Sequence, residues 1–278
     1  MRFKTKCQLI SLVIANAFTL NACSNPSTAN NKSNDNNTVQ QKVVTNQQAG
    51  QKTTSNMQAE LDKAKKASKA IFVVITGTGA TDIDKATTIA KGANGIYKNA
   101  IVVTMNRDDA TNASLVSEWR LAGAPLPLIL VISPKGYPTG GYILAQATAQ
   151  NIAELVPSPK MDDVYEALNG KKSVFLVISK KSYTDRSKIL DNCKSAVSQL
   201  QNKASVIEID LTDTKEAVFI KQLNLKSVPN ASSILVLNAA GQTTGTFGGN
   251  AETTALVLAA NKVVKSGCCP SGSGSSCK

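Results

Sequence analysis

The sequence contains no histidine among its 278 residues. This absence excludes Ser-His-Asp and Cys-His catalysis, histidine metal ligands and histidine proton shuttles. Aromatic residues are also scarce, at 4%, and no dense basic cluster is interleaved with them. Although the net charge is +12, the basic residues are scattered, as is typical of solvated faces. We therefore expect no nucleic-acid partner. An enzyme, which we do not favour, would have to use cysteine, lysine, tyrosine or carboxylates.

Long apolar runs are missing too, apart from one near the N-terminus. Residues 9–20 are almost wholly apolar, but this run is shorter than the about 20 residues that a membrane-spanning helix needs. Three basic residues, Arg2, Lys4 and Lys6, precede it, as in a signal peptide. Residues 1–22 are therefore predicted to be a signal peptide.

The predicted signal peptide ends in a small residue followed by a thiol. The segment Leu20-Asn21-Ala22-Cys23 resembles the lipobox of bacterial lipoproteins. The resemblance implies cleavage before Cys23 and lipidation of its thiol, so that the membrane becomes a partner through the lipid. The alternative is an ordinary secretory signal with a chance cysteine. Ser24 stands where an aspartate would retain a Gram-negative lipoprotein at the inner membrane. We therefore expect a lipid-anchored, periplasm-facing protein of the cell envelope, at the outer rather than the inner membrane.

The next segment, residues 23–56, is rich in Asn, Ser, Thr and Gln and has almost no large apolar residue. Such a composition cannot bury enough apolar surface to offset the entropy of ordering the backbone. The segment is predicted to be a disordered tether between the membrane and the folded part of the chain.

From Met57 onward, short β-branched runs alternate with helical patterns, and the alternation occurs twice. Strands are expected at 70–75, 100–105, 128–132, 142–145, 173–178, 205–210, 234–237 and 243–247. Helices are expected at 57–68, 82–97, 112–121, 149–156, 161–168, 183–201, 215–223 and 251–264. Pro127 and Pro229 are 102 residues apart (229 − 127). The pattern predicts a duplicated α/β unit, with domains at 57–158 and 159–265 and a tail at 266–278.

The order of motifs within each unit resembles that of a thioredoxin-like domain. In the first unit, AIVVTMN (100–106) is followed by a helix, GAPLP (123–127), a strand and SPKG (133–136). In the second, SVIEID (205–210) is followed by a helix, KSVP (226–229), a strand and TFGG (246–249). The resemblance implies two tandem three-layer α/β/α domains. It also places Pro127 and Pro229 at the family's cis-proline position, with Pro125 as the alternative to Pro127.

What the family does at that position implies a partner. Thioredoxin-like domains bind extended substrates beside the cis-proline, so the resemblance implies a protein or peptide partner at the edges formed by Leu126 and Val228. The family's Cys-x-x-Cys is missing, however. TGTGATD (76–82) and SKKSYTD (179–185) stand in its place, and without sulfur these loops cannot perform thiol–disulfide exchange. The glycines of the first loop lack the Lys-Ser/Thr of a phosphate loop, so a plain loop is the better interpretation.

Four cysteines remain besides Cys7 and Cys23. Cys193 falls on the apolar stripe of an expected helix and is interpreted as a buried structural residue. The other three, Cys268, Cys269 and Cys277, lie in the Gly/Ser-rich tail. They could bind a soft metal such as Cu(I), act as a redox-active arm with catalytic thiols, or form structural disulfides, and the sequence leaves these alternatives open. No other cofactor is expected.

The sequence thus predicts a lipid-anchored envelope protein. Its two thioredoxin-like domains lack the redox motif and act as a binding or scaffold module. A thiol oxidoreductase or soft-metal binder working through the tail cysteines is the alternative.

Overall fold

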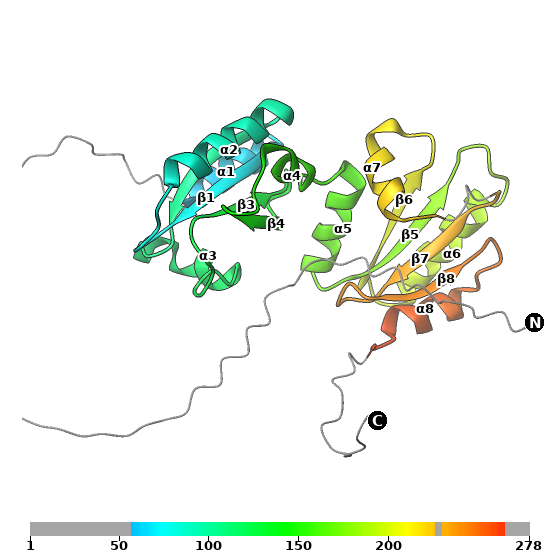
Figure 1. Ribbon diagram of the computed structural model, residues 1–278. Helices are drawn as coiled ribbons and strands as arrows, with labels where there is room; N and C mark the ends of the chain where they lie inside the picture. The colour runs from blue at the N-terminus through cyan, green and yellow to red at the C-terminus, as the bar shows by residue number, and fades with distance from the viewer. Residues whose placement is uncertain (1–56, 226–229, 265–278) are drawn as a thin grey trace, which may run out of the picture.

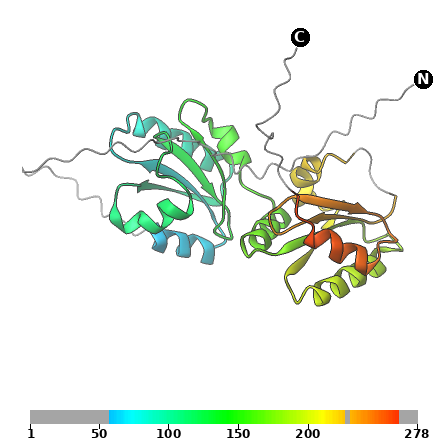
Figure 2. The same cartoon turned by 90° about the horizontal axis from the view of Figure 1, so that it is seen from below.

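The computed structural model describes residues 57–225 and 230–264. Figures 1 and 2 show two lobes, each built around its own four-stranded sheet. The strands of domain 1 are β1 (Ala70–Thr76), β2 (Ala100–Asn106), β3 (Leu128–Ile132) and β4 (Pro138–Ile143). Its helices are α1 (Met57–Lys66), α2 (Ile83–Ile96), η1 (Ala110–Asn112), α3 (Ala113–Glu118) and α4 (Ala149–Glu154).

Domain 2 repeats this order of elements. Its strands are β5 (Ser173–Ser179), β6 (Ala204–Asp210), β7 (Ser233–Leu237) and β8 (Thr243–Phe247). Its helices are α5 (Pro159–Asn169), α6 (Arg186–Gln199), η2 (Thr214–Glu216), α7 (Ala217–Gln222) and α8 (Thr253–Asn261). Among the described residues, none of the helices has both the length and the apolar character needed to cross a bilayer.

The two sheets have the same topology. Their strand orders are β2-β1-β3-β4 and β6-β5-β7-β8. In each, the first two strands along the chain pair in parallel and the remaining pairs are antiparallel. The parallel connection runs through a helix, α2 or α6, as such connections require. This mixed four-stranded sheet with interleaved helices is a thioredoxin-like fold, and the predicted fold class is confirmed.

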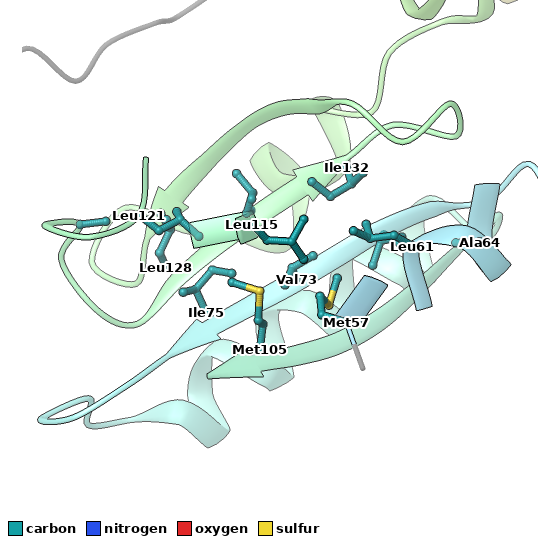
Figure 3. Close-up of a cluster of buried hydrophobic side chains, with 13 residues drawn as sticks. Met57, Leu61, Ala64, Val73, Ile75, Met105, Leu115, Leu121, Leu128 and Ile132 are labelled. Atoms are coloured by element: carbon teal, nitrogen blue, oxygen red, sulfur yellow. The ribbon is translucent and has the colours of Figure 1, made fainter. Parts of the chain in front are cut away.

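Helices cover both faces of each sheet and produce the three layers. In domain 1, α1 and α3 pack on one face, where Met57 and Leu61 meet Val73, Ile75 and Met105 (Figure 3). The opposite face buries Phe72 and Val74 beneath α2 and α4. Domain 2 has the same plan, with Phe175 facing α6 and α8. The central strands β1 and β5 are buried along their whole length, which explains their continuous apolar sequences.

The expected strand at 142–145 is wrong, since β4 runs from Pro138 to Ile143. Pro138, Gly140 and Gly141 lack strand propensity, so the pattern gave no signal for them. They are tolerated because β4 is an edge strand that pairs only with β3. A Cβ atom on Gly141 would lie 2.7 Å from the carbonyl oxygen of Ile129, so the close approach of the two backbones requires glycine.

The single helix expected at 112–121 is also wrong. The structure has the 3₁₀ turn η1 followed by the short helix α3. Asp109 caps η1 by accepting the N–H of Thr111 at 2.9 Å, which fixes a tighter first turn than the apolar pattern indicates. The segment ends early because Arg120 has a left-handed φ of 54°, and this conformation stops a helix.

Candidate functional site

The loop between β1 and α2 of domain 1, within the segment TGTGATD (76–82), contains no cysteine. Gly77 in this loop lies so close to its neighbours that a Cβ atom there would be 2.8 Å from Asp108 Oδ2 and 3.0 Å from Leu126 Cδ1. The carboxylate of Asp108 accepts the N–H of Thr78, and this hydrogen bond lowers the pKa of Asp108. Asp108 therefore holds the loop against Leu126.

A second charged side chain fixes the segment that leads into Leu126. The guanidinium of Arg107 donates to the carbonyl of Leu121 at 3.1 Å and to the carbonyl of Ala124 at 2.6 Å. Hydrogen bonds from a charged donor are stronger than neutral ones. Arg107 and Asp108 are neighbours in sequence, so one short segment after β2 positions both the loop and the approach to Pro127.

Leu126 also lines an open groove, which has a volume of about 510 Å³. It is lined by Thr81, Lys85, Ile89, Pro125, Leu126, Pro127, Ile143, Leu144, Ala145 and Ala147. Lys85 is the one ionisable side chain in that lining, and Thr81 is the other polar one. Most of the lining side chains are therefore apolar, with a single positive charge at the wall.

The backbone of Leu126 is available at this groove. The Leu126–Pro127 peptide bond is cis, and the carbonyl of Pro127 accepts the N–H of Leu144 at 3.1 Å. Within residues 57–225 and 230–264, however, neither the N–H nor the carbonyl of Leu126 has a hydrogen-bond partner. An extended polypeptide could supply both partners by pairing with Leu126, as in strand addition.

In domain 2 the corresponding loop, between β5 and α6, is held by different hydrogen bonds. The carboxylate of Asp185, at the start of α6, accepts both the N–H of Ser232 at 3.1 Å and its hydroxyl at 2.8 Å. Near the base of this loop, Arg186 forms a two-pronged ion pair with Glu208, whose Oε1 also accepts the hydroxyl of Ser179. The carboxylates of Asp185 and Glu208 and the guanidinium of Arg186 thus bond to other groups of domain 2.

Several sequence predictions concern residues outside the described part of the chain. These are the lipidation site Cys23, the cis-proline candidate Pro229, and the tail cysteines Cys268, Cys269 and Cys277. Cys193 is fully buried, and burial raises its pKa to about 12, so its thiol stays protonated at neutral pH. Within the described ranges, no group of three His, Cys, Asp or Glu residues is arranged to hold a metal ion.

A polar cluster that was not predicted from the sequence lies where the two domains meet. Lys135, in the turn between β3 and β4, lies 2.5 Å from Asp163 Oδ1 and 2.5 Å from Glu166 Oε2, both on α5. Burial disfavours the charged lysine, but the two carboxylates outweigh it and raise the pKa of Lys135. Asp162 is 3% exposed and accepts the backbone N–H of Lys135 at 3.1 Å. Burial raises the pKa of Asp162.

Arg107, Asp108 and Lys85 were likewise not predicted as site residues from the sequence. Arg107 and Asp108 follow a buried strand directly, which is a common place for polar side chains that position loops. That position was the signal that could have identified them. Lys85 had no such signal, because a lysine on an amphipathic helix is normally a solvated residue.

No protein-family model and no curated protein matches the chain. Among solved structures, the chain is similar to the first two thioredoxin domains of Saccharomyces cerevisiae Eps1p. The identity is 12%, the coverage is 73% of this chain and 96% of that one, and the TM-score is 0.26. It is also similar to human ERp44 in a zinc-bound form, at 9% identity over 71% of this chain and 56% of that one, with a TM-score of 0.31. The assignment of both domains here rests on strand order and register, not on these similarities.

Proposed function

We propose that the chain is a lipid-anchored cell-envelope protein whose two thioredoxin-like domains form a binding module without thiol–disulfide chemistry. The observation that carries the proposal is the open groove of domain 1 beside the backbone of Leu126, whose N–H and carbonyl have no partner among the described residues. A groove lined largely by apolar side chains, next to one backbone N–H and one C=O that can accept a partner strand, fits an extended polypeptide segment. The family's redox loops contain no sulfur, and Cys193 is buried with a raised pKa, so neither site supplies a thiolate for exchange.

The groove also indicates the chemistry of its occupant. Leu126, Ile143 and Leu144 line it on the apolar side, so we expect apolar side chains at alternate positions of the bound segment. Lys85 adds a positive charge, and an acidic residue placed against it would be favoured. The proposed ligand is therefore an extended, mainly apolar segment of a protein partner with one carboxylate.

Filling the groove should weaken this binding strongly. Ala145 lines the groove and is exposed, so Ala145→Trp should obstruct the site without disturbing the core. With a fluorescent ten-residue peptide of alternating Val and Thr carrying one Glu, we expect fluorescence anisotropy to show a loss of affinity of about tenfold or more. The neighbouring exposed residue Gln146 does not line the groove, and Gln146→Trp should bind like the unmodified protein.

A charge exchange tests the predicted preference in the same assay. Lys85→Glu should weaken binding of the Glu-containing peptide and strengthen binding of its Glu-to-Lys counterpart. Equal affinity of Ala145→Trp and the unmodified protein would remove the groove as the site. Reduction of a disulfide substrate by the chain with Cys268, Cys269 and Cys277 changed to Ser would contradict the non-redox part of the proposal.

The anchor is proposed from the lipobox resemblance at Leu20 to Cys23. A thiol is required to accept the lipid, so Cys23→Ser should move the protein from the detergent-soluble membrane fraction to the soluble fraction. It should also remove incorporation of labelled palmitate. Ser24→Asp is the matched control, because it keeps the thiol and should keep the label. Unchanged labelling and membrane association of Cys23→Ser would leave the ordinary secretory signal as the better interpretation.

A further inference from the structure

One end of domain 2 contains the starts of two strands and the end of a helix. Ser173, the first residue of β5, donates its N–H to the carbonyl of Lys203, just before β6, at 3.0 Å. Its hydroxyl donates to the carbonyl of Ala260 in α8 at 3.0 Å. The side-chain amide of Asn238 donates to the carbonyl of Lys262 at 2.9 Å. Ser173 and Asn238 are each 6% exposed, so buried polar side chains hold these three element ends together.

Four exposed lysines lie at this end, and we call them the basic end of domain 2. They are Lys171, Lys172, Lys203 and Lys262. Lys172 and Lys203 directly precede Ser173 and Ala204, the first paired residues of β5 and β6, so they are neighbours across the two strand starts. Like charges on neighbouring strands are destabilising. The arrangement therefore has an electrostatic cost that an anionic partner would remove.

The basic end has no acidic partner in the part of the chain that the structure describes. None of its four lysines forms an ion pair there. Asp163 and Glu166 line a groove together with Lys172, but both are bound to Lys135. The chain segments that form this end contain no Asp or Glu, and they are 169–173, 200–206, 238–242 and 256–264. The four positive charges therefore face solvent or a partner from outside the domain.

Helix ends explain part of this arrangement. Helices α5, α6 and α8 all end just before lysines of the basic end, and a positive charge after the C-terminus of a helix is favoured by the helix dipole. Each C-terminus carries about half a negative charge, so the three together offset roughly 1.5 of the four positive charges. The basic end remains positive, and the helix dipoles do not balance all of its charge.

Apolar side chains flank the basic end. Leu258, Val263 and Val264 are 74%, 81% and 40% exposed, and they are three of the five large apolar side chains that are exposed among the described residues. Leu258 lies one helical turn before Lys262, on the same side of α8. The side-chain amide of Gln242 donates to the carbonyl of Val264 at 3.1 Å, which keeps this segment beside the β7–β8 turn. Binding to a bilayer surface increases with both buried apolar area and attraction to anionic lipids.

We propose that the basic end of domain 2 binds the surface of a bilayer that contains anionic lipids. The lysines lie against the headgroup phosphates, and Leu258 and Val263 reach the boundary with the acyl chains. A soluble polyanion would use the lysines alone and leave the exposed apolar side chains unexplained. This contact is additional to the proposed lipid on Cys23 and does not depend on it. Where that lipid is present, it keeps the basic end close to a bilayer, so weak binding is sufficient.

Removal of the four charges tests the proposal. The test uses the mature chain without its lipid, residues 24–278, so its result is independent of the anchor. The four substitutions are combined in one variant: Lys171→Gln, Lys172→Gln, Lys203→Gln and Lys262→Gln. Binding to vesicles of phosphatidylglycerol and phosphatidylcholine in equal parts is measured by co-sedimentation. It should fall about 100-fold or more, since each lysine near an anionic surface contributes about fivefold.

A matched control removes the same number of positive charges elsewhere in domain 2. Its substitutions to Gln are at the exposed residues Lys181, Lys188, Lys215 and Lys221. None of these lysines forms an ion pair among the described residues. The control has the same net charge as the test variant, and it should bind the vesicles nearly as tightly as the unmodified chain. Equal vesicle binding of the two variants overturns the proposal.

The apolar side chains distinguish a bilayer from a soluble polyanion. Leu258→Ser combined with Val263→Ser should weaken vesicle binding about tenfold or more and leave binding to soluble polyphosphate unchanged. Val218 is 62% exposed on α7, and Val218→Ser should change neither. If the Leu258→Ser, Val263→Ser chain binds vesicles as tightly as the unmodified chain, the bilayer is wrong and the basic end is assigned to a soluble polyanion.

Discussion

Replacing Phe72 by alanine is expected to lower the free energy of unfolding of domain 1 by about 3–5 kcal/mol. Phe72 is 0% exposed and packs in the middle of β1, beneath α2 and α4. Its removal leaves a cavity between the sheet and these helices, lined by Val102 and Val131. Since single domains are stable by about 5–15 kcal/mol, this loss is a large fraction of the total.

Hydrogen exchange by mass spectrometry with increasing denaturant separates the two domains. Phe72→Ala should reduce protection in 57–154 and leave 173–225 unchanged, because the domains have separate cores. Phe175 occupies the matching position (175 − 72 = 103) and is also 0% exposed, so Phe175→Ala should give the reverse pattern. Ile96 is 51% exposed, and Ile96→Ala should change stability by no more than about 0.5 kcal/mol. A loss of protection shared equally by both domains would show that they unfold as one unit.

Removing the carboxylate of Glu216 should destabilise domain 2 by about 2–4 kcal/mol. Glu216 is 1% exposed. Its oxygens accept the hydroxyl of Ser158 at 2.5 Å and the N–H of Lys160 at 3.0 Å, which places a negative charge at the N-terminus of α5. Hydrogen bonds to charged groups contribute about 1.5–3 kcal/mol each, and Glu216→Ala removes two of them. The expected loss is smaller than their sum, because both donors, on Ser158 and Lys160, are only part-buried and can bond to water instead.

Denaturant unfolding and exchange protection in α5 measure this effect. Glu216→Gln keeps one acceptor oxygen and the shape of the side chain, so it should cost less, about 1–2 kcal/mol. Glu252 is exposed and makes no capping hydrogen bond at the start of α8, so Glu252→Ala should have little effect. If Glu216→Ala costs no more than Glu252→Ala, the carboxylate does not hold α5 in place.

The pattern of apolar residues predicted most of the fold. Strands buried on both faces appear as continuous apolar runs, and buried helix faces appear as apolar residues at helical spacing. The all-buried runs of β1 and β5 and the stripe of α6 through Cys193 were identifiable in this way. The pattern failed where a strand is set by backbone contacts and not by apolar side chains. The edge strand β4 is built from Pro138 and two glycines, and its pairing with β3 depends on close backbone approach that no hydrophobic signal reports.

The sequence predicted where the candidate site lies, but not the side chains that position it. The motif order around Pro127 indicated where a groove would lie, but its supports are polar residues that look like any surface residue in sequence. Arg107 binds two carbonyls that are 14 and 17 residues further along the chain, and such pairs are set by the folded geometry. Asp162 and Glu216 are buried for the same reason, since each meets a partner from a different element.

The contact between Lys135 and α5 has a mechanical consequence. Lys135, Asp163 and Glu166 have side chains that are 34%, 30% and 52% exposed, and ion pairs of this exposure are worth about 0–1 kcal/mol each. Each domain, in contrast, is held by a core in which a single phenylalanine contributes about 3–5 kcal/mol. Even with the buried hydrogen bond from the Lys135 N–H to Asp162, the joint between the domains contains few strong contacts, so under a pull along the chain we expect it to separate before either core unfolds. The molecule can therefore lengthen and reorient its two halves while both remain folded.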